Sequence, residues 1–164
     1  MNRNDLKGDE KVSKWKVEGT LNQGFQGHIE YQILLPKETK SVKMLFEFDP
    51  REAKDQFETW NQKCVQALKE NIVEEKNTFE TGMQMPYYKM LKSEINLSVY
   101  YKNVCLGCFH KDHTCKKIEI SDENATEGFQ PCVFTGGVMT ISLHVYSILN
   151  DQTKYQLEVF YEDR

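Results

Sequence analysis

The sequence predicts a mainly β protein, a jelly-roll-like antiparallel β-sandwich of about eight strands with one long amphipathic helix packed on it. Apolar residues alternate with polar residues along many short segments, which is typical of strands with one buried side. Glycine, proline and asparagine separate these segments. A single segment repeats its apolar residues at helical spacing, whereas a doubly wound parallel fold needs several alternations of strand and helix.

The predicted strands follow one another along the chain. From Ile29 to Leu35 every second residue is apolar, and the residues between them are mostly polar. The same period marks residues 42–48, 94–102, 139–145 and 154–162, and weaker strands fit residues 15–17, 104–108 and 118–120. The Asn150-Asp151 turn between the last two strands predicts a hairpin.

Residues 50–72 carry the helical pattern. Phe57, Trp60 and Cys64 recur every three or four positions, which indicates one apolar stripe of a helix. Asp49 is suited to cap this helix, and Pro50 is suited to the first helical position. We expect a long amphipathic helix over about residues 50–72, packed on the sheet.

Length and composition predict a single domain over residues 1–164. An apolar share of 39% is enough for a core that needs no disulfide or metal, and residues 1–11 are polar enough to be a flexible N-terminal tail. The 21 basic and 25 acidic residues are well mixed, so no basic patch indicates nucleic-acid binding.

The predicted location is the cytoplasm. No apolar stretch approaches the roughly 18–20 residues of a membrane span, and the polar N-terminus lacks the apolar run of a secretory signal. An odd number of cysteines, five, indicates free thiols in a reducing compartment.

The densest group of metal-type ligands lies within residues 105–115. A structural zinc site there would use Cys105, Cys108 and two of three further side chains, His110, His113 and Cys115. Residues three apart in an extended strand face opposite sides, which argues against Cys105 and Cys108 holding one ion. We therefore expect no cofactor, with free thiols and surface histidines, and keep a zinc-stabilised module as an alternative.

Three aromatic residues fall out of phase with the predicted core. Tyr100, Tyr146 and Phe160 are on the polar side of their strands, and His144 shares that side. Aromatic side chains on a solvated face indicate a contact surface for a ligand or partner, here a protein or a glycan. The loop of residues 108–115 is an alternative surface. The sequence contains no phosphate-binding glycine loop, His-x-His or Gly-x-Ser-x-Gly motif, so no catalytic residue is assigned.

The C-terminal half has a distinctive order of short motifs. Residues 125–129 read Ala-Thr-Glu-Gly-Phe, and Gly136-Gly137 precedes the strand at 139–145. Over about 65 residues this order resembles the N-terminal β-sandwich that precedes the catalytic domain in bacterial PHP metal-dependent phosphoesterases of the CehA/McbA type. The layout is also similar to that of pre-peptidase jelly-roll domains.

The resemblance implies an accessory domain. The metal ligands of the phosphoesterase catalytic domain have no matching positions in this chain. We therefore expect a non-catalytic binding module that works with a separate phosphoesterase or another protein partner, with its oligomeric state open. The alternatives are the zinc-stabilised module and a hydrolase related to metal-dependent phosphoesterases.

Overall fold

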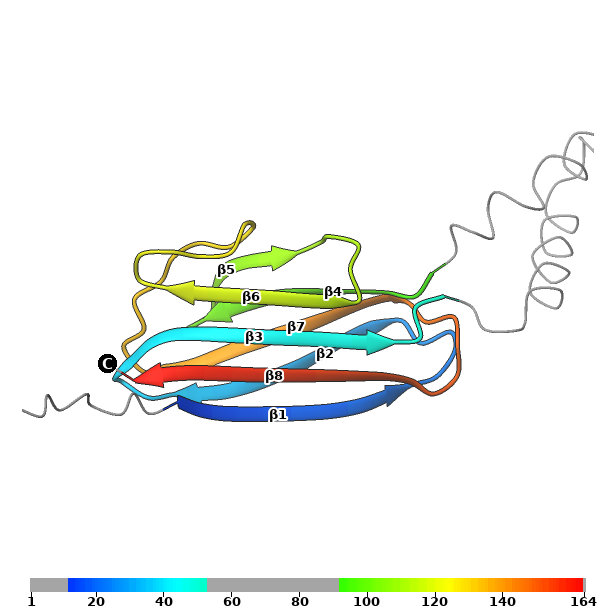
Figure 1. Cartoon of the computed structure of the whole chain (residues 1–164), viewed down its shortest axis with the longest axis horizontal. Coiled ribbons are helices and arrows are strands. Elements are labelled where there is room, and N and C mark those ends of the chain that lie inside the picture. The colour runs from blue at the N-terminus through cyan, green and yellow to red at the C-terminus, as the bar shows by residue number, and fades with distance from the viewer. Residues whose placement is uncertain (1–11, 53–91, 164) are drawn as a thin grey trace, which may run out of the picture.

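The chain folds into a β-sandwich in the computed structural model, which describes residues 12–52 and 92–163. Two four-stranded antiparallel sheets face each other (Figure 1). One sheet has the order β1 (Val12–Leu21), β8 (Thr153–Asp163), β3 (Thr39–Asp49) and β6 (Cys115–Ser121). The other has the order β2 (Gly27–Leu35), β7 (Gly137–Ser147), β4 (Glu94–Tyr101) and β5 (Val104–Phe109). The predicted mainly β sandwich is confirmed.

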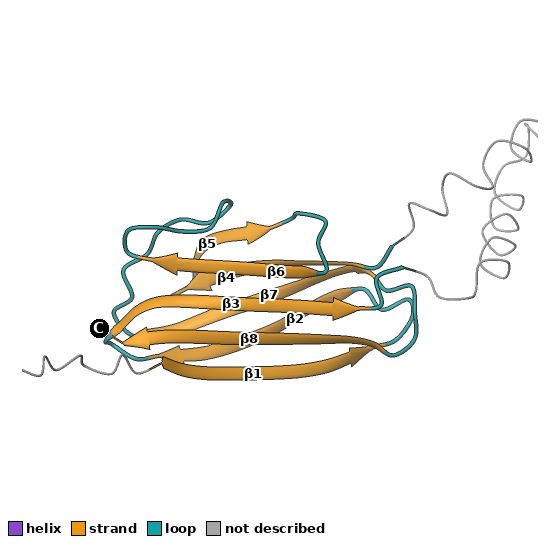
Figure 2. Ribbon diagram, in the orientation of Figure 1, coloured by secondary structure: helices purple, strands orange, loops and turns teal. Residues whose placement is uncertain are grey.

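Strands that are consecutive in the sequence mostly lie in different sheets (Figure 2). β4 and β5 are the exception, and form a hairpin through Lys102 and Asn103, both with positive φ. The predicted hairpin between the last two strands is wrong, because β7 pairs with β2 and β4 whereas β8 pairs with β1 and β3. The turn at Asn150 and Asp151 therefore carries the chain from one sheet to the other.

The core lies between the sheets and contains the alternating apolar residues. Burial of these side chains is the main favourable term in folding, at about 25 cal/mol per Å² of apolar surface. Tyr31 of β2 and Tyr155 of β8 join the two sheets through a hydrogen bond of 2.6 Å between their hydroxyl groups. The largest buried apolar side chains are Leu35, Phe46, Ile95, Leu97, Ile120, Phe134, Met139, Ile141, Leu143, Ile148 and Leu157.

The predicted helix start is wrong. Residues 50–52 are not helical, since Glu52 forms an antiparallel bridge with Lys92 and the amide of Ser93 donates to the carbonyl of Arg51 at 2.7 Å. These contacts hold the chain extended where a first helical turn was expected. The remainder of the predicted helix, residues 53–72, and the predicted tail, residues 1–11, lie outside the described residues.

A loop covers the free edge of β5. The amide of Cys108 donates to the carbonyl of Gly128 at 3.1 Å, and the amide of Gln130 donates to the carbonyl of Leu106 at 2.7 Å. Covering the unpaired groups of an edge strand protects it from pairing with another chain. Within residues 12–52 and 92–163, no helix has the length and hydrophobicity to cross a bilayer.

Candidate functional site

The outward side of the β1-β8-β3-β6 sheet carries closely paired charges, and we call it the charged face. Lys14 and Lys16 of β1 lie 2.9 and 3.8 Å from the carboxylate of Glu158 on β8, and Lys16 also pairs with Glu18 at 2.6 Å. Cross-strand pairs of opposite charge stabilise a sheet modestly and are typical of a solvated surface. The charged face is therefore explained by solubility and sheet stability.

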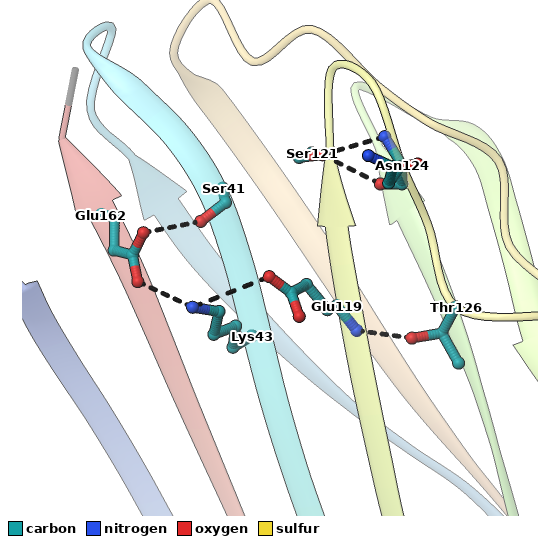
Figure 3. A network of polar contacts seen from close by, with 7 residues as sticks. All are labelled: Ser41, Lys43, Glu119, Ser121, Asn124, Thr126 and Glu162. Atoms are coloured by element: carbon teal, nitrogen blue, oxygen red, sulfur yellow. Dashed lines mark hydrogen bonds and ion pairs between the residues drawn. The ribbon is translucent and has the colours of Figure 1, made fainter.

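A polar network continues across the charged face to β6 (Figure 3). Lys43 of β3 donates to Glu162 of β8 at 2.9 Å and lies 3.6 Å from Glu119 of β6. Ser41 donates to the other carboxylate oxygen of Glu162 at 3.3 Å. These contacts hold the pKa of the Glu162 carboxyl below its usual value, chiefly through the hydrogen bond from Lys43. Each charge in this network is thus satisfied within the chain.

The outward side of the β2-β7-β4-β5 sheet differs in character, and we call it the histidine face. Its central strands carry uncharged polar and aromatic side chains at their outward positions: Thr140, Ser142, His144 and Tyr146 on β7, and Asn96, Ser98 and Tyr100 on β4. Asn96, Ser98 and Ser142 are buried although they point away from the core. Among the described residues, no ion pair joins two side chains of these four strands, in contrast to the charged face.

A row of three histidines and an asparagine crosses the histidine face. The register pairs His28 of β2 with His144 of β7, and His144 with Asn96 of β4. His110, directly after β5, approaches Asn96 with 3.4 Å between its Nδ1 and the Asn96 Nδ2. Residues from four places in the sequence therefore meet in one line.

His28 and His144 contact each other directly. Their Nδ1 atoms are 2.8 Å apart, and their rings are nearly perpendicular with centroids 4.8 Å apart. The Nε2 of His144 lies 2.8 Å from the Oγ of Ser98. Burial, followed by the nearby charges of His28 and His110, lowers the pKa of His144. The neutral imidazole is therefore favoured at this position.

Asn96 has an incomplete set of hydrogen bonds. Its Nδ2 donates to the Glu94 carboxylate at 3.0 Å, whereas its buried Oδ1 has no hydrogen-bond partner among the described residues. A buried carbonyl oxygen without a donor costs free energy. An added donor at this point of the row would satisfy it.

The four residues predicted as a partner surface do not share one face. Tyr100, His144 and Tyr146 lie on the histidine face, where Tyr146 is 52% exposed. Phe160 lies on the charged face, with the Lys14 ammonium 5.1 Å from its ring centroid. The alternation in the sequence correctly separates these residues from the core, but it does not say which of two sheets each belongs to.

The five predicted metal ligands are also divided between the sheets. Cys115 pairs with Glu47 on the charged face, and burial followed by a hydrogen bond to Glu47 raises the pKa of its thiol. His113 lies in the connection after β5, with its ring 6.4 Å from that of Phe109. Among the residues that the structure describes, no group of three or more His, Cys, Asp and Glu side chains lies close enough to hold a metal ion.

Cys105 and Cys108 lie on the same face, contrary to the expectation for a regular strand. Cys105 pairs with Tyr100 and Cys108 pairs with Ser98, two residues apart on β4, because a bulge interrupts the register of β5. Both thiols thus belong to the edge of the histidine face, with His110 beyond them. The extra residue of the bulge changes which side chains share a face, and the sequence alone gives no sign of it.

An open groove of about 670 Å³ lies at the end of the charged face. It contains three acidic residues, Glu18, Glu47 and Asp49, together with Lys154 and part of the Tyr155 side chain. The hydrogen bond from Lys16 lowers the pKa of the Glu18 carboxyl. A general acid at neutral pH needs the opposite shift, so Glu18 is not adjusted for that role.

Sequence reasoning missed three members of the candidate site, His28, Asn96 and Ser98. Each occupies a polar position of a correctly predicted alternation, which marks it as outward-facing. The signal that would single them out is the pairing of β2 and β4 with β7. That pairing joins residues up to 116 positions apart, as His28 and His144 are.

The comparisons with known proteins identify one family. Residues 11–164 match the model of a family described as a family of unknown function, DUF6669. No curated protein matches the chain. Because the matching region spans the sandwich and nearly the whole sequence, the chain belongs to the DUF6669 family.

Proposed function

We propose that this protein is a non-catalytic binding module that contacts a protein or glycan partner through the histidine face. The observation that carries the proposal is the contrast between the two outward sides of the sandwich. The charged face satisfies its own charges through ion pairs, whereas the histidine face offers uncharged polar groups and exposed apolar side chains. Recognition surfaces are depleted in charge at their centre and enriched in aromatic residues.

Exposed apolar residues lie towards both ends of the histidine face. Tyr146 follows the histidine row on β7, and at the other end Leu34 of β2 pairs with Val138 of β7. Leu34 is 73% exposed and Val138 is 43% exposed. A polar centre flanked by apolar contacts gives a partner both hydrogen-bond specificity and apolar surface to bury.

We also propose a jelly-roll topology and an accessory role beside a separate phosphoesterase or another protein. The nested pairing of β1 with β8, β2 with β7, β3 with β6 and β4 with β5 supports the jelly roll. The resemblance of residues 95–161 to the sandwich of CehA/McbA-type phosphoesterases supports the accessory role. On this proposal the purified chain hydrolyses no phosphodiester by itself.

A site-specific cross-linking experiment tests which face binds. A photoreactive phenylalanine analogue replaces Tyr146 on the histidine face in one variant and Phe160 on the charged face in the other. Both replacements exchange one aromatic side chain for another, so we expect both variants to fold. A difference in cross-linking between them then reports the face and not a loss of folding. We expect irradiation in extracts of the source organism to give a discrete adduct from position 146 and none from position 160. An adduct from position 160 alone contradicts the proposal.

A zinc-stabilised module is the second candidate, and one observation favours it. The bulge in β5 places Cys105 and Cys108 on one face, which a regular strand does not allow, although among the described residues no third ligand lies close enough to complete a site in the fold as it stands. Elemental analysis of the untagged protein, with thermal melts in the presence and absence of a chelator, tests it. About one zinc per chain and a melting temperature lowered by the chelator are expected of a structural zinc site, and metal-free protein with an unchanged melt contradicts it.

A further inference from the structure

The pair of His28 and His144 has the arrangement of a two-imidazole chelate. The two residues are directly opposite each other on neighbouring antiparallel strands, which places their side chains side by side on one face. Their Nδ1 atoms approach to 2.8 Å. Such an approach requires one proton between the two nitrogens, because two facing lone pairs would repel.

The second ring nitrogen of His144 is already occupied. Its Nε2 is 2.8 Å from the Oγ of Ser98, a contact that fixes the orientation of the ring. A histidine that ligates a metal usually donates its other ring N–H to a hydrogen-bond acceptor. That hydrogen bond sets the tautomer and directs the free lone pair at the ion.

The two nitrogens are at hydrogen-bond distance in the fold, since 2.8 Å is the length of an ordinary N–H···N contact. Metal–imidazole bonds are about 2.0–2.1 Å long, so an ion bound by both nitrogens would replace the shared proton and lie off the line that joins them. Neutral imidazole is a ligand that suits Zn²⁺, Ni²⁺ and Cu²⁺.

We propose that His28 and His144 bind one divalent transition-metal ion of this class through their Nδ1 atoms, with water completing the coordination. On binding, the proton between the rings moves through solvent to the Nε2 of His28, so both rings stay neutral and both Nδ1 lone pairs face the ion. This site differs from the Cys105–Cys115 cluster and does not depend on the proposed partner.

Calorimetric titration of the full-length untagged protein tests the site, with Ni²⁺ as the probe and Zn²⁺ for comparison. We expect one Ni²⁺ per chain. The variants His28→Ala and His144→Gln should each lower the Ni²⁺ affinity at least about tenfold, and Ser98→Ala should also weaken it, because it frees the ring of His144. His113→Ala is the matched control and should leave the titration unchanged.

Three outcomes of these titrations would contradict the proposal. Absence of Ni²⁺ binding contradicts it, and so does binding that persists unchanged in both histidine variants. Binding that is lost in the double variant Cys105→Ser/Cys108→Ser but retained in His28→Ala assigns the metal to the cysteines instead. Thermal melts without metal establish that each variant is folded; His28 is an exposed side chain, so its substitution leaves the core intact.

Discussion

At the scale of single residues, Lys116 is an unusual feature of the sandwich. It is 1% exposed and lies opposite Phe46 at an inward position of β6. Its ammonium donates to the carbonyl of Lys111 at 2.8 Å and lies 5.0 Å from the ring centroid of Phe109. Burial lowers the pKa of Lys116 to about 8, an effect that the Glu94 carboxylate opposes only in part. Because the described residues offer this buried ammonium one hydrogen-bond acceptor and no paired carboxylate, its burial reduces the stability of the fold.

This cost predicts a specific pH dependence. From about pH 8 to the ordinary lysine value of 10.5, the unfolded chain holds a proton on Lys116 that the folded chain has released. The contribution of Lys116 to the free energy of unfolding therefore increases with pH over this range, because the unfolded state binds the extra proton. We expect Lys116→Met to be more stable than the wild type at pH 7, by on the order of 2 kcal/mol, and to lack that contribution.

Urea denaturation of both proteins from pH 7 to 10.5 measures the effect. The stability difference between them isolates Lys116 from the tyrosines and cysteines that titrate in the same range. A difference that stays constant with pH, or a less stable variant at pH 7, would show that the ammonium is better stabilised than its contacts indicate.

Gly107 is required by a close approach of two backbones. A Cβ at this position would lie 2.1 Å from the carbonyl oxygen of Gly128, and the φ of Gly107 is +148°. We expect Gly107→Ala to lower the free energy of unfolding by at least about 2 kcal/mol, because the loop covering β5 must move. Gly24→Ala is the control, since Gly24 has a φ of +81° and open space around it, and backbone strain alone should cost about 1 kcal/mol. Equal losses in the two variants would mean that the loop adapts without cost.

At the scale of secondary-structure elements, the ends of residues 53–91 are fastened to the sandwich. Glu52 and Lys92 form an antiparallel bridge, and the side chains of Arg51 and Lys92 both pair with Asp112. The eight strands described here all lie outside that segment. All the strand pairs of the two sheets join residues within 12–52 and 92–163, which predicts that the sandwich can fold without residues 53–91.

Replacement of residues 53–91 by a short Gly/Ser linker tests this independence. Antiparallel bridged ends are close enough for a few residues to join them, and a shorter loop costs less closure entropy. We expect the shortened chain to keep the far-ultraviolet circular dichroism of a β protein and a cooperative thermal transition. Aggregation of the shortened chain, or a transition without cooperativity, would contradict the independence of the sandwich.

The strands show how far local pattern predicts a fold. The inward sets of β4 and β7 follow from alternation alone, and every predicted core residue from Ile95 to Tyr101 is buried. For β1 the sequence indicated only residues 15–17, although the strand continues to Leu21. The next inward position is Gly19, where a Cβ would lie 2.3 Å from the Tyr155 side chain, so a distant ring fills the place of a local apolar residue.

At the scale of the whole molecule, the candidate site depends on which strands become neighbours. Alternation places His28, Asn96 and His144 on outward sides, but each of two sheets has an outward side. The pairing of β7 with both β2 and β4 gathers these residues into one row, and the same topology places Phe160 on the opposite face. Strand order is set by packing of the complete chain. The sequence therefore predicts which residues face outward, but not which of these residues lie together on one sheet.

Binding of a partner to the histidine face is tested most directly by affinity measurements. The affinity of a captured partner is measured for the wild type and for two double variants. Tyr146→Ala/Leu34→Ala removes exposed apolar side chains from the histidine face, and Lys14→Ala/Lys43→Ala removes exposed charges from the charged face. All four side chains are well exposed or lie at the surface, so both variants should fold. The account predicts at least about a tenfold loss of affinity, or 1.4 kcal/mol, for the first variant and little change for the second. Unchanged binding by the first variant together with loss of binding by the second would contradict it.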